Sequence, residues 1–162
     1  MKKFIMAVIA GFLMTATVCT AADSPDLPMA LAQAAFFTGL TDAERDMLKS
    51  VTRLRQARAG ERIITQGTKS GSMFIILNSP AHILVNGNHI VTLTGQTLVG
   101  EIEFLDTFPA SADVIVTRDT DLIEVNHAAL TGLMDQQPRI GYVLMRELAR
   151  IAAQRLRAGN PK

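Results

Sequence analysis

Residues Gly100-Glu101-Ile102-Glu103-Phe104-Leu105, followed by Pro109-Ala110-Ser111-Ala112, form the stretch of this chain that decides its fold. The Gly-Glu pair opens a short turn, and the Pro-x-Ser-Ala segment leads into the β-rich run Val114-Ile115-Val116. A glycine lets the backbone approach a bound group closely, and a carboxylate beside it accepts hydrogen bonds from hydroxyl groups. The stretch therefore predicts a small-molecule pocket with the site residues Gly100, Glu101, Ile102, Glu103, Ala110, Ser111 and Ala112.

Short aliphatic and β-branched runs, separated by glycines, lie on both sides of this stretch. They are Leu54, Ile63-Ile64, Met73 to Leu77, Ile83 to Val85, Ile90 to Leu93, Val114 to Val116 and Leu122 to Val125. The Asn86-Gly87-Asn88 segment between two of these runs is a hairpin signal. About eight short strands at this regular spacing predict an antiparallel β-roll of the double-stranded β-helix, or jelly-roll, type.

Helical patterns flank the β-rich part of the chain. Residues 29–37 form an apolar helical stretch, and Thr41-Asp42-Ala43-Glu44 is a capping box that starts the next helix. After the last β-rich run, residues 128–134 predict a short helix, and Pro138 starts a longer one that ends near Arg157. The predicted fold class is mainly β with flanking helices: N-terminal helices, an eight-stranded roll and two C-terminal helices.

The 162 residues are enough for one domain with a sizeable core. We expect a signal peptide at 1–22, a linker at 23–28, the domain at 29–158 and a tail at 159–162. The first segment has Lys2-Lys3, an uncharged run from Phe4 to Val18 and small residues at 20–22, the layout of a bacterial export signal. We therefore expect a periplasmic protein. The alternative is an uncleaved anchor in the inner membrane.

Several classes of function are disfavoured by the composition. The only cysteine, Cys19, lies in the predicted signal peptide, so the mature chain would have no thiol chemistry and no disulfide. The net charge is +1 without a basic cluster, and nucleic acid is therefore not an expected partner. His82, His89 and His127 are scattered singly along the sequence, so we expect no metal and no cofactor.

The order of these elements resembles the cyclic nucleotide-binding domain family, as in catabolite activator protein and the regulatory subunits of cyclic-AMP-dependent kinase. The resemblance covers residues 36–157. It is carried by Phe36-Phe37-Thr38-Gly39-Leu40, Gly60, Gly67, Gly95, Gly100-Glu101-Ile102, Asp121 to Val125 and Pro138. It implies a β-roll in which a cassette containing residues 100–112 holds the ribose phosphate of cAMP or cGMP.

Two departures from the family pattern weaken that implication. The resemblance implies that Glu101 binds the ribose 2′-hydroxyl and that an arginine grips the phosphate, but Ala110 stands at the arginine position. A charge-assisted contact of about 1.5–3 kcal/mol is lost, which weakens binding by about tenfold to a hundredfold. Glu103 replaces a small residue, and Asp113 adds another acid. We expect these charges to repel a phosphate.

Each of the two cassette carboxylates has two interpretations. Glu101 either accepts a hydroxyl of a sugar-like ligand or ties down the cassette turn through backbone N–H groups. Glu103 either selects a neutral or cationic ligand or is a solvated side chain at the rim of an idle pocket. For both residues the sequence favours the second interpretation.

The predicted terminal helix has an apolar stripe of Ile140, Leu144, Leu148 and Ile151. This stripe packs either on the roll or against a second copy, so a homodimer through residues 138–157 stays open. The arginines of the helix, Arg146, Arg150, Arg155 and Arg157, suit a solvated face. Arg150 or Arg157 could also reach the pocket and replace the missing cation.

We therefore expect a non-enzymatic, exported module with a degenerate phosphate cassette, which binds an unknown small ligand or protein partner. One alternative is a membrane-anchored cytoplasmic sensor of cyclic nucleotides. Another is an enzyme that uses the inside of the β-roll, although the chain lacks the His-x-His cluster of a cupin-type metal site.

Overall fold

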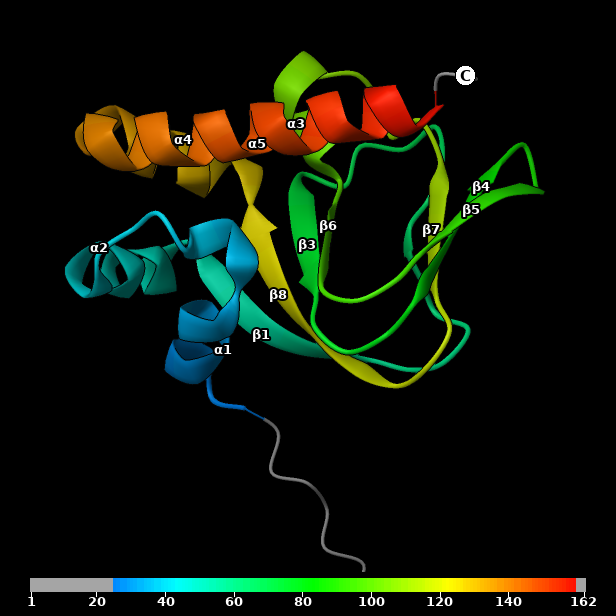
Figure 1. Ribbon diagram of the computed structural model, residues 1–162, viewed down its shortest axis with the longest axis horizontal. Coiled ribbons are helices and arrows are strands. Elements are labelled where there is room, and N and C mark those ends of the chain that lie inside the picture. Colours follow the sequence, from blue (N-terminus) through cyan, green and yellow to red (C-terminus); the bar gives the residue numbers. More distant parts are fainter. Residues whose placement is uncertain (1–24, 160–162) are drawn as a thin grey trace, which may run out of the picture.

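The chain folds into a β-roll of two four-stranded sheets with helices before, within and after it (Figure 1). This computed structural model describes residues 25–159, so the predicted signal peptide lies outside the described residues. Every pair of neighbouring strands is antiparallel. The predicted fold class, mainly β with an eight-stranded antiparallel roll and flanking helices, is confirmed.

The first sheet is covered on both faces. Its strands are, in spatial order, β1 (Thr52–Ala57), β8 (Thr120–Asn126), β3 (Ser72–Ile76) and β6 (Thr97–Val99). Successive side chains of a strand point to opposite faces. Met73 and Ile75 of β3 accordingly pack in a core that the helices share, whereas Phe74 and Ile76 pack between the two sheets.

The second sheet is closed on one face only. Its strands are β2 (Arg62–Ile64), β7 (Asp113–Val116), β4 (Ala81–Val85) and β5 (Asn88–Leu93), and β5 is an exposed edge. The β4–β5 hairpin projects away from the roll (Figure 1). Its turn has positive φ angles at Asn86 (52°) and Gly87 (78°), which confirms the predicted hairpin.

The first N-terminal helix starts earlier than the sequence predicted. Helix α1 (Leu27–Gln33) begins inside the predicted 23–28 linker, because the Asp26 side chain accepts a hydrogen bond from the Met29 amide at 2.9 Å and caps the helix. A short 3-10 turn, η1 (Ala35–Phe37), follows. The predicted capping box of Thr41 and Glu44 starts α2 (Asp42–Met47), which continues into η2 (Leu48–Ser50).

Three further helices lie within the roll or after it. They are α3 (Glu101–Asp106), α4 (His127–Gln136) and α5 (Pro138–Gly159). Helix α5 lies across one end of the roll, with α3 beside its C-terminal half (Figure 1). Its residues Ile140, Leu144 and Leu148 are at most 1% exposed, so the predicted stripe packs on the domain. Within residues 25–159, no helix has the length and apolar character of a membrane span.

Candidate functional site

A cavity of about 600 Å³ opens at the cassette, and all seven predicted site residues line it. The other lining residues are Ile64, Ile83, Ile90, Val91, Leu93, Val99 and Val114 of the strands and Arg155, Ala158 and Gly159 of α5. Pockets of this size hold drug-sized molecules. The wall is mainly branched aliphatic, with its charged groups gathered where α3 and α5 meet.

Gly100 is required at the entry to the cassette. Its φ is +85°, and it is the residue before the first turn of α3. A Cβ atom at this position would lie 3.0 Å from the Ser72 carbonyl oxygen and 3.1 Å from the Met73 Cα. Both the backbone angle and the close approach to β3 therefore exclude an ordinary side chain.

Ala110 forms part of the apolar wall. Its side chain is 8% exposed, and its backbone is fixed on both sides: its amide donates to the Thr68 carbonyl at 2.9 Å and its carbonyl accepts from the Gly67 amide at 2.8 Å. The cavity thus has a methyl group where the family resemblance implies an arginine. Ser111 beside it is exposed at the cavity.

Glu101 is paired with an arginine of α5. Its side chain is 2% exposed, and a guanidinium nitrogen of Arg155 donates to Glu101 Oε1. Arg155 also donates to the Leu98 carbonyl and to Thr97 Oγ1, the latter at 3.4 Å. The prediction that Glu101 ties down the cassette through backbone N–H groups is therefore wrong, because the last turns of α5 supply its partner.

Neither Arg150 nor Arg157, the two arginines predicted to replace the missing cation, pairs with Glu101. Arg150 is paired with Glu147 on its own helix, and Arg157 is exposed. Arg155 continues the buried stripe, since it lies four residues after Ile151 and seven after Leu148. This helical spacing could have shown that Arg155 faces the domain, but the sequence interpretation placed it on the solvated face of the helix.

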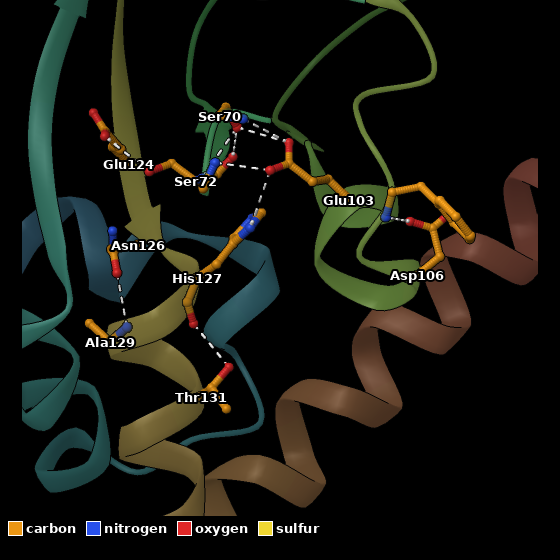
Figure 2. A network of polar contacts seen from close by, with 11 residues as sticks. Ser70, Ser72, Glu103, Asp106, Glu124, Asn126, His127, Ala129 and Thr131 are labelled. Atoms are coloured by element: carbon orange, nitrogen blue, oxygen red, sulfur yellow. Dashed lines mark hydrogen bonds and ion pairs between the residues drawn. The ribbon is translucent and has the colours of Figure 1, made fainter. Parts of the chain in front are cut away.

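Glu103 points back into the protein, and it is 6% exposed rather than solvated at a rim (Figure 2). Its carboxylate accepts hydrogen bonds from the Gly71 amide at 2.9 Å and from the amide and hydroxyl of Ser70 at 3.1 Å each. Burial disfavours its charge, but the hydrogen bonds from Gly71 and Ser70 outweigh this effect and lower the pKa of Glu103. It is a fixed internal anion.

His127, the first residue of α4, meets Glu103 from the other side (Figure 2). Its Nδ1 lies 3.9 Å from Glu103 Oε1, its ring centroid is 5.2 Å from that of Phe104, and its amide donates to the Gly71 carbonyl at 2.9 Å. Burial lowers the pKa of His127, against the opposing effect of Glu103. The cassette is thus joined to α4 by a buried polar contact.

The predicted repulsion by acids applies to fewer groups than the sequence suggested. Asp113 is 8% exposed, accepts a hydrogen bond from the Gln66 amide at 2.8 Å and lies 3.7 Å from the Arg62 guanidinium. Glu101 is paired with Arg155. Of the three acids, Glu103 alone lacks a cationic partner within the described residues, because the lowered pKa of His127 favours the neutral ring.

The sequence indicated three isolated histidines, but two of them lie together in the structure. The rings of His82 and His89, on the β4–β5 hairpin, lie with their centroids 5.0 Å apart and nearly perpendicular. No group of three or more His, Cys, Asp or Glu side chains that could hold a metal ion occurs in the described part of the chain.

A second, smaller cavity lies next to the first. It has a volume of about 370 Å³ and is bounded by η1, by the chain leading into β6 and by α5. Leu93, Arg155 and Ala158 line both cavities. The Arg155 side chain is therefore part of the partition between them.

The fold and the cassette agree with a sequence comparison. The sequence profile described as "Cyclic nucleotide-binding domain" matches residues 54–137, which is more than half of the chain. The chain belongs to the cyclic nucleotide-binding domain family. The resemblance predicted from the cassette residues is confirmed, and the family is one of regulatory ligand-binding domains.

Two curated relatives are much longer than this chain. Glutaminase 1 of Bradyrhizobium diazoefficiens is 29% identical over 133 residues, 82% of this chain and 22% of that protein. The Pycsar effector protein XpPycTIR of Xanthomonas perforans is 32% identical over 114 residues, 70% of this chain and 37% of that protein. The chain thus spans between about a fifth and two fifths of the length of these relatives.

Solved structures share the fold. A cyclic nucleotide-binding domain from Methylobacillus flagellatus superposes with a TM-score of 0.70 at 19% identity, over 82% of this chain and 77% of that one. The regulatory subunit of a cAMP-independent protein kinase A from Trypanosoma brucei gives 0.55 at 22% identity, over 72% and 48%. The latter is a triple variant bound to cAMP in the A site, with glutamate changed to alanine, a threonine seven positions later to arginine, and the next residue, valine, to alanine.

Proposed function

We propose that this domain is a non-enzymatic binding module for a small ligand without net negative charge, and that it does not bind cAMP or cGMP in the usual way. The observation that carries the proposal is the buried methyl group of Ala110 at the position of the phosphate grip. The one cation among the described residues that line the cavity, Arg155, is engaged by the buried Glu101. A phosphate would meet the internal negative charge of Glu103 without a free cation to balance it.

The cAMP-independent kinase subunit supports this reading. In its cAMP-bound variant the three replaced residues have the same spacing as Glu103, Ala110 and Ser111 in this chain. The first of them is a glutamate, as here, and the replacement seven positions later introduces an arginine. The pattern fits a cassette in which the glutamate and the missing arginine together prevent binding of cAMP.

Calorimetric titration with cAMP, cGMP and adenosine tests the proposal, because adenosine is the counterpart of cAMP without the charged phosphate. We expect no heat of binding for either cyclic nucleotide up to millimolar concentration. The triple variant Glu103→Ala/Ala110→Arg/Ser111→Ala is expected to bind cAMP. The matched variant Glu103→Ala/Ala110→Gln/Ser111→Ala, with a long uncharged side chain, is expected not to bind it. Micromolar binding of cAMP by the unaltered protein would contradict the proposal.

An exported setting is part of the same proposal. The support is the charge pattern of residues 2–22, with two lysines, an uncharged run and small residues at the expected cleavage site. Mass spectrometry of the protein purified from its native host is expected to find Asp23 at the N-terminus. A retained Met1 or Lys2 would instead favour the membrane-anchored sensor.

A homodimer through α5 is supported by a second stripe on that helix. Tyr142, Met145 and Leu156 are 65%, 39% and 70% exposed, and with Ala149 and Ala152 they recur at alternating spacings of three and four residues. This heptad spacing is self-complementary in a two-fold pair of helices. Light scattering after gel filtration is expected to give a dimer, which Met145→Glu/Leu156→Glu dissociates and Gln154→Glu does not. A monomeric unaltered protein would refute it.

A further inference from the structure

We propose that the ligand of the 600 Å³ cavity is an apolar α-amino acid, held at its two charged ends by Glu101 and Arg155. This inference rests on the proposed function, because it names the ligand class for the same cavity. It starts from the ion pair of Glu101 and Arg155. Among the described residues, this is the only ion pair whose two partners both line the cavity.

The charge balance of this pair restricts the ligand. The Glu101 side chain is 2% exposed and that of Arg155 is 33% exposed. A ligand that is only anionic would draw Arg155 away and leave a buried carboxylate unpaired, which is strongly unfavourable. A ligand that is only cationic would compete for Glu101 and leave the guanidinium without its partner. A zwitterion offers an ammonium group to Glu101 and a carboxylate to Arg155, so neither protein charge loses its counterion.

Both side chains have hydrogen-bonding capacity for such a ligand. Arg155 reaches Glu101, the Leu98 carbonyl and Thr97 Oγ1 through two of its nitrogens, and a guanidinium has five N–H donors. Only Oε1 of Glu101 accepts a hydrogen bond among the described residues, so Oε2 can accept from an ammonium group. The ammonium and carboxylate groups of an α-amino acid are attached to the same carbon atom, which suits a carboxylate and a guanidinium in direct contact.

The rest of the cavity determines the side chain of the ligand. Ile64, Ile83, Val91, Leu93, Val99 and Val114 present branched aliphatic groups to it. A polar side chain would lose its hydration against this wall without a compensating hydrogen bond, whereas an apolar one gains from burial. Leucine and phenylalanine therefore fit better than glutamate, asparagine or lysine.

The test compares whole amino acids with their halves, by calorimetry on the unaltered protein. The probes are L-leucine and L-phenylalanine, 4-methylpentanoate, which lacks the ammonium group of leucine, and 3-methylbutylamine, which lacks the carboxylate. We expect leucine to bind and both half-molecules to bind at least tenfold more weakly than leucine. Glu101→Gln and Arg155→Gln are expected to weaken the amino acid at least tenfold, and Arg157→Gln, on the same helix, is expected to leave its affinity unchanged.

The outcomes separate this inference from the proposed function. Binding of either half-molecule as tightly as leucine overturns the amino acid assignment, as does the absence of leucine binding. If leucine does not bind but adenosine does, the cavity takes an uncharged ligand and the proposed function stands, whereas tight binding of the anionic 4-methylpentanoate would contradict the proposed function as well. If cAMP binds the unaltered protein at micromolar concentration, the proposed function fails as well. Since the half-molecules are tested on the unaltered protein, a variant that does not fold leaves the result intact.

Discussion

The two faces of the sheet β1-β8-β3-β6 are made from the same kinds of side chain, but they have different neighbours. On one face, Met73, Ile75 and Ile123 are at most 1% exposed and pack with Leu144 and Leu148 of α5. On the other face, the side chains meet the second sheet, which encloses the cavity and continues to an edge strand. The helix face forms a filled core, whereas the roll interior is only partly filled.

This difference shows that an aliphatic run in the sequence predicts a strand with an apolar face, but it does not predict which element packs on that face. Ile90 of β5 belongs to a mainly aliphatic run, as the core residues of β3 do, yet it is 60% exposed and lines the cavity. A large apolar side chain left beside a cavity adds little to stability and remains available to a ligand. The two faces should therefore respond differently to the same mutation.

The largest expected effect is the loss of a side chain from the filled core. Leu148 is 0% exposed, so Leu148→Ala is expected to lower the free energy of unfolding by about 2–5 kcal/mol. Ile90→Ala, a similar truncation at the cavity, is expected to change it by less than about 0.5 kcal/mol. Urea unfolding of the two variants measures the contrast. Equal losses would show that the roll interior is as well packed as the helix face.

The next largest effect is expected at Gly100, where the start of the cassette lies against the backbone of β3. Gly100→Ala is expected to cost about 1–3 kcal/mol, because it combines a positive φ with contacts of about 3 Å to the β3 backbone. Gly60→Ala is the matched control: its φ is +82°, and no atom lies within 4 Å of the added Cβ. If both variants lose the same stability in urea unfolding, the close approach of β3 contributes nothing.

A smaller effect is expected from the cap of α4 on the helix face. The Asn126 side chain accepts a hydrogen bond from the Ala129 amide at 2.9 Å, so Asn126→Ala is expected to cost about 1 kcal/mol. Asn126→Asp keeps the acceptor and is expected to restore most of that stability in thermal or urea unfolding. A loss as large as that of Leu148→Ala would mean that capping, rather than burial, dominates this face.

The smallest effect is a dependence of stability on pH at the buried contact between the cassette and α4. Burial lowers the pKa of His127 below its usual 6.5. The contribution of His127 to the stability of the fold is therefore complete above pH 6.5 and is lost as the pH falls through the folded-state pKa. The Glu103 pKa is lowered below 4.5, chiefly by hydrogen bonds that outweigh burial, so its contribution is lost at lower pH still. Both groups make acid destabilising.

Urea unfolding between pH 8 and pH 4 checks this sign. In His127→Asn the decline that begins below about pH 6.5 should disappear, while His82→Asn, on the exposed hairpin, should keep it. A stability that rises on acidification through this range would mean that the folded state binds the proton at His127 more tightly than the unfolded chain does.

Much of the fold could be predicted because its signals are local. The Thr41–Glu44 capping box, the Asn86-Gly87 turn and the cassette glycine act over a few residues. Strand β6 (Thr97–Val99) was missed, because a run of three residues with two aliphatic side chains has no periodicity to read. The start of α1 was misplaced, because Asp26 and Pro28 fit a linker as well as a capped first turn.

The site was predicted less completely because its contacts join distant segments. The seven predicted residues that line the cavity lie within thirteen positions of each other, and the cassette pattern identified them. The partner of Glu101, by contrast, lies 54 residues along the chain, and the Ser70-Gly71 turn that binds Glu103 lies about 30 residues before it. No local pattern reports such pairings, although the helical phase of Arg155 could have been used.

The partition at Arg155 gives the molecule a thermodynamic property that neither cavity would have alone. A solute that shifts this guanidinium reshapes both compartments, since the same side chain borders each of them. If a solute bound in one compartment changes the affinity of the other compartment by some factor, then by linkage a solute bound in the other must change the affinity of the first by the same factor.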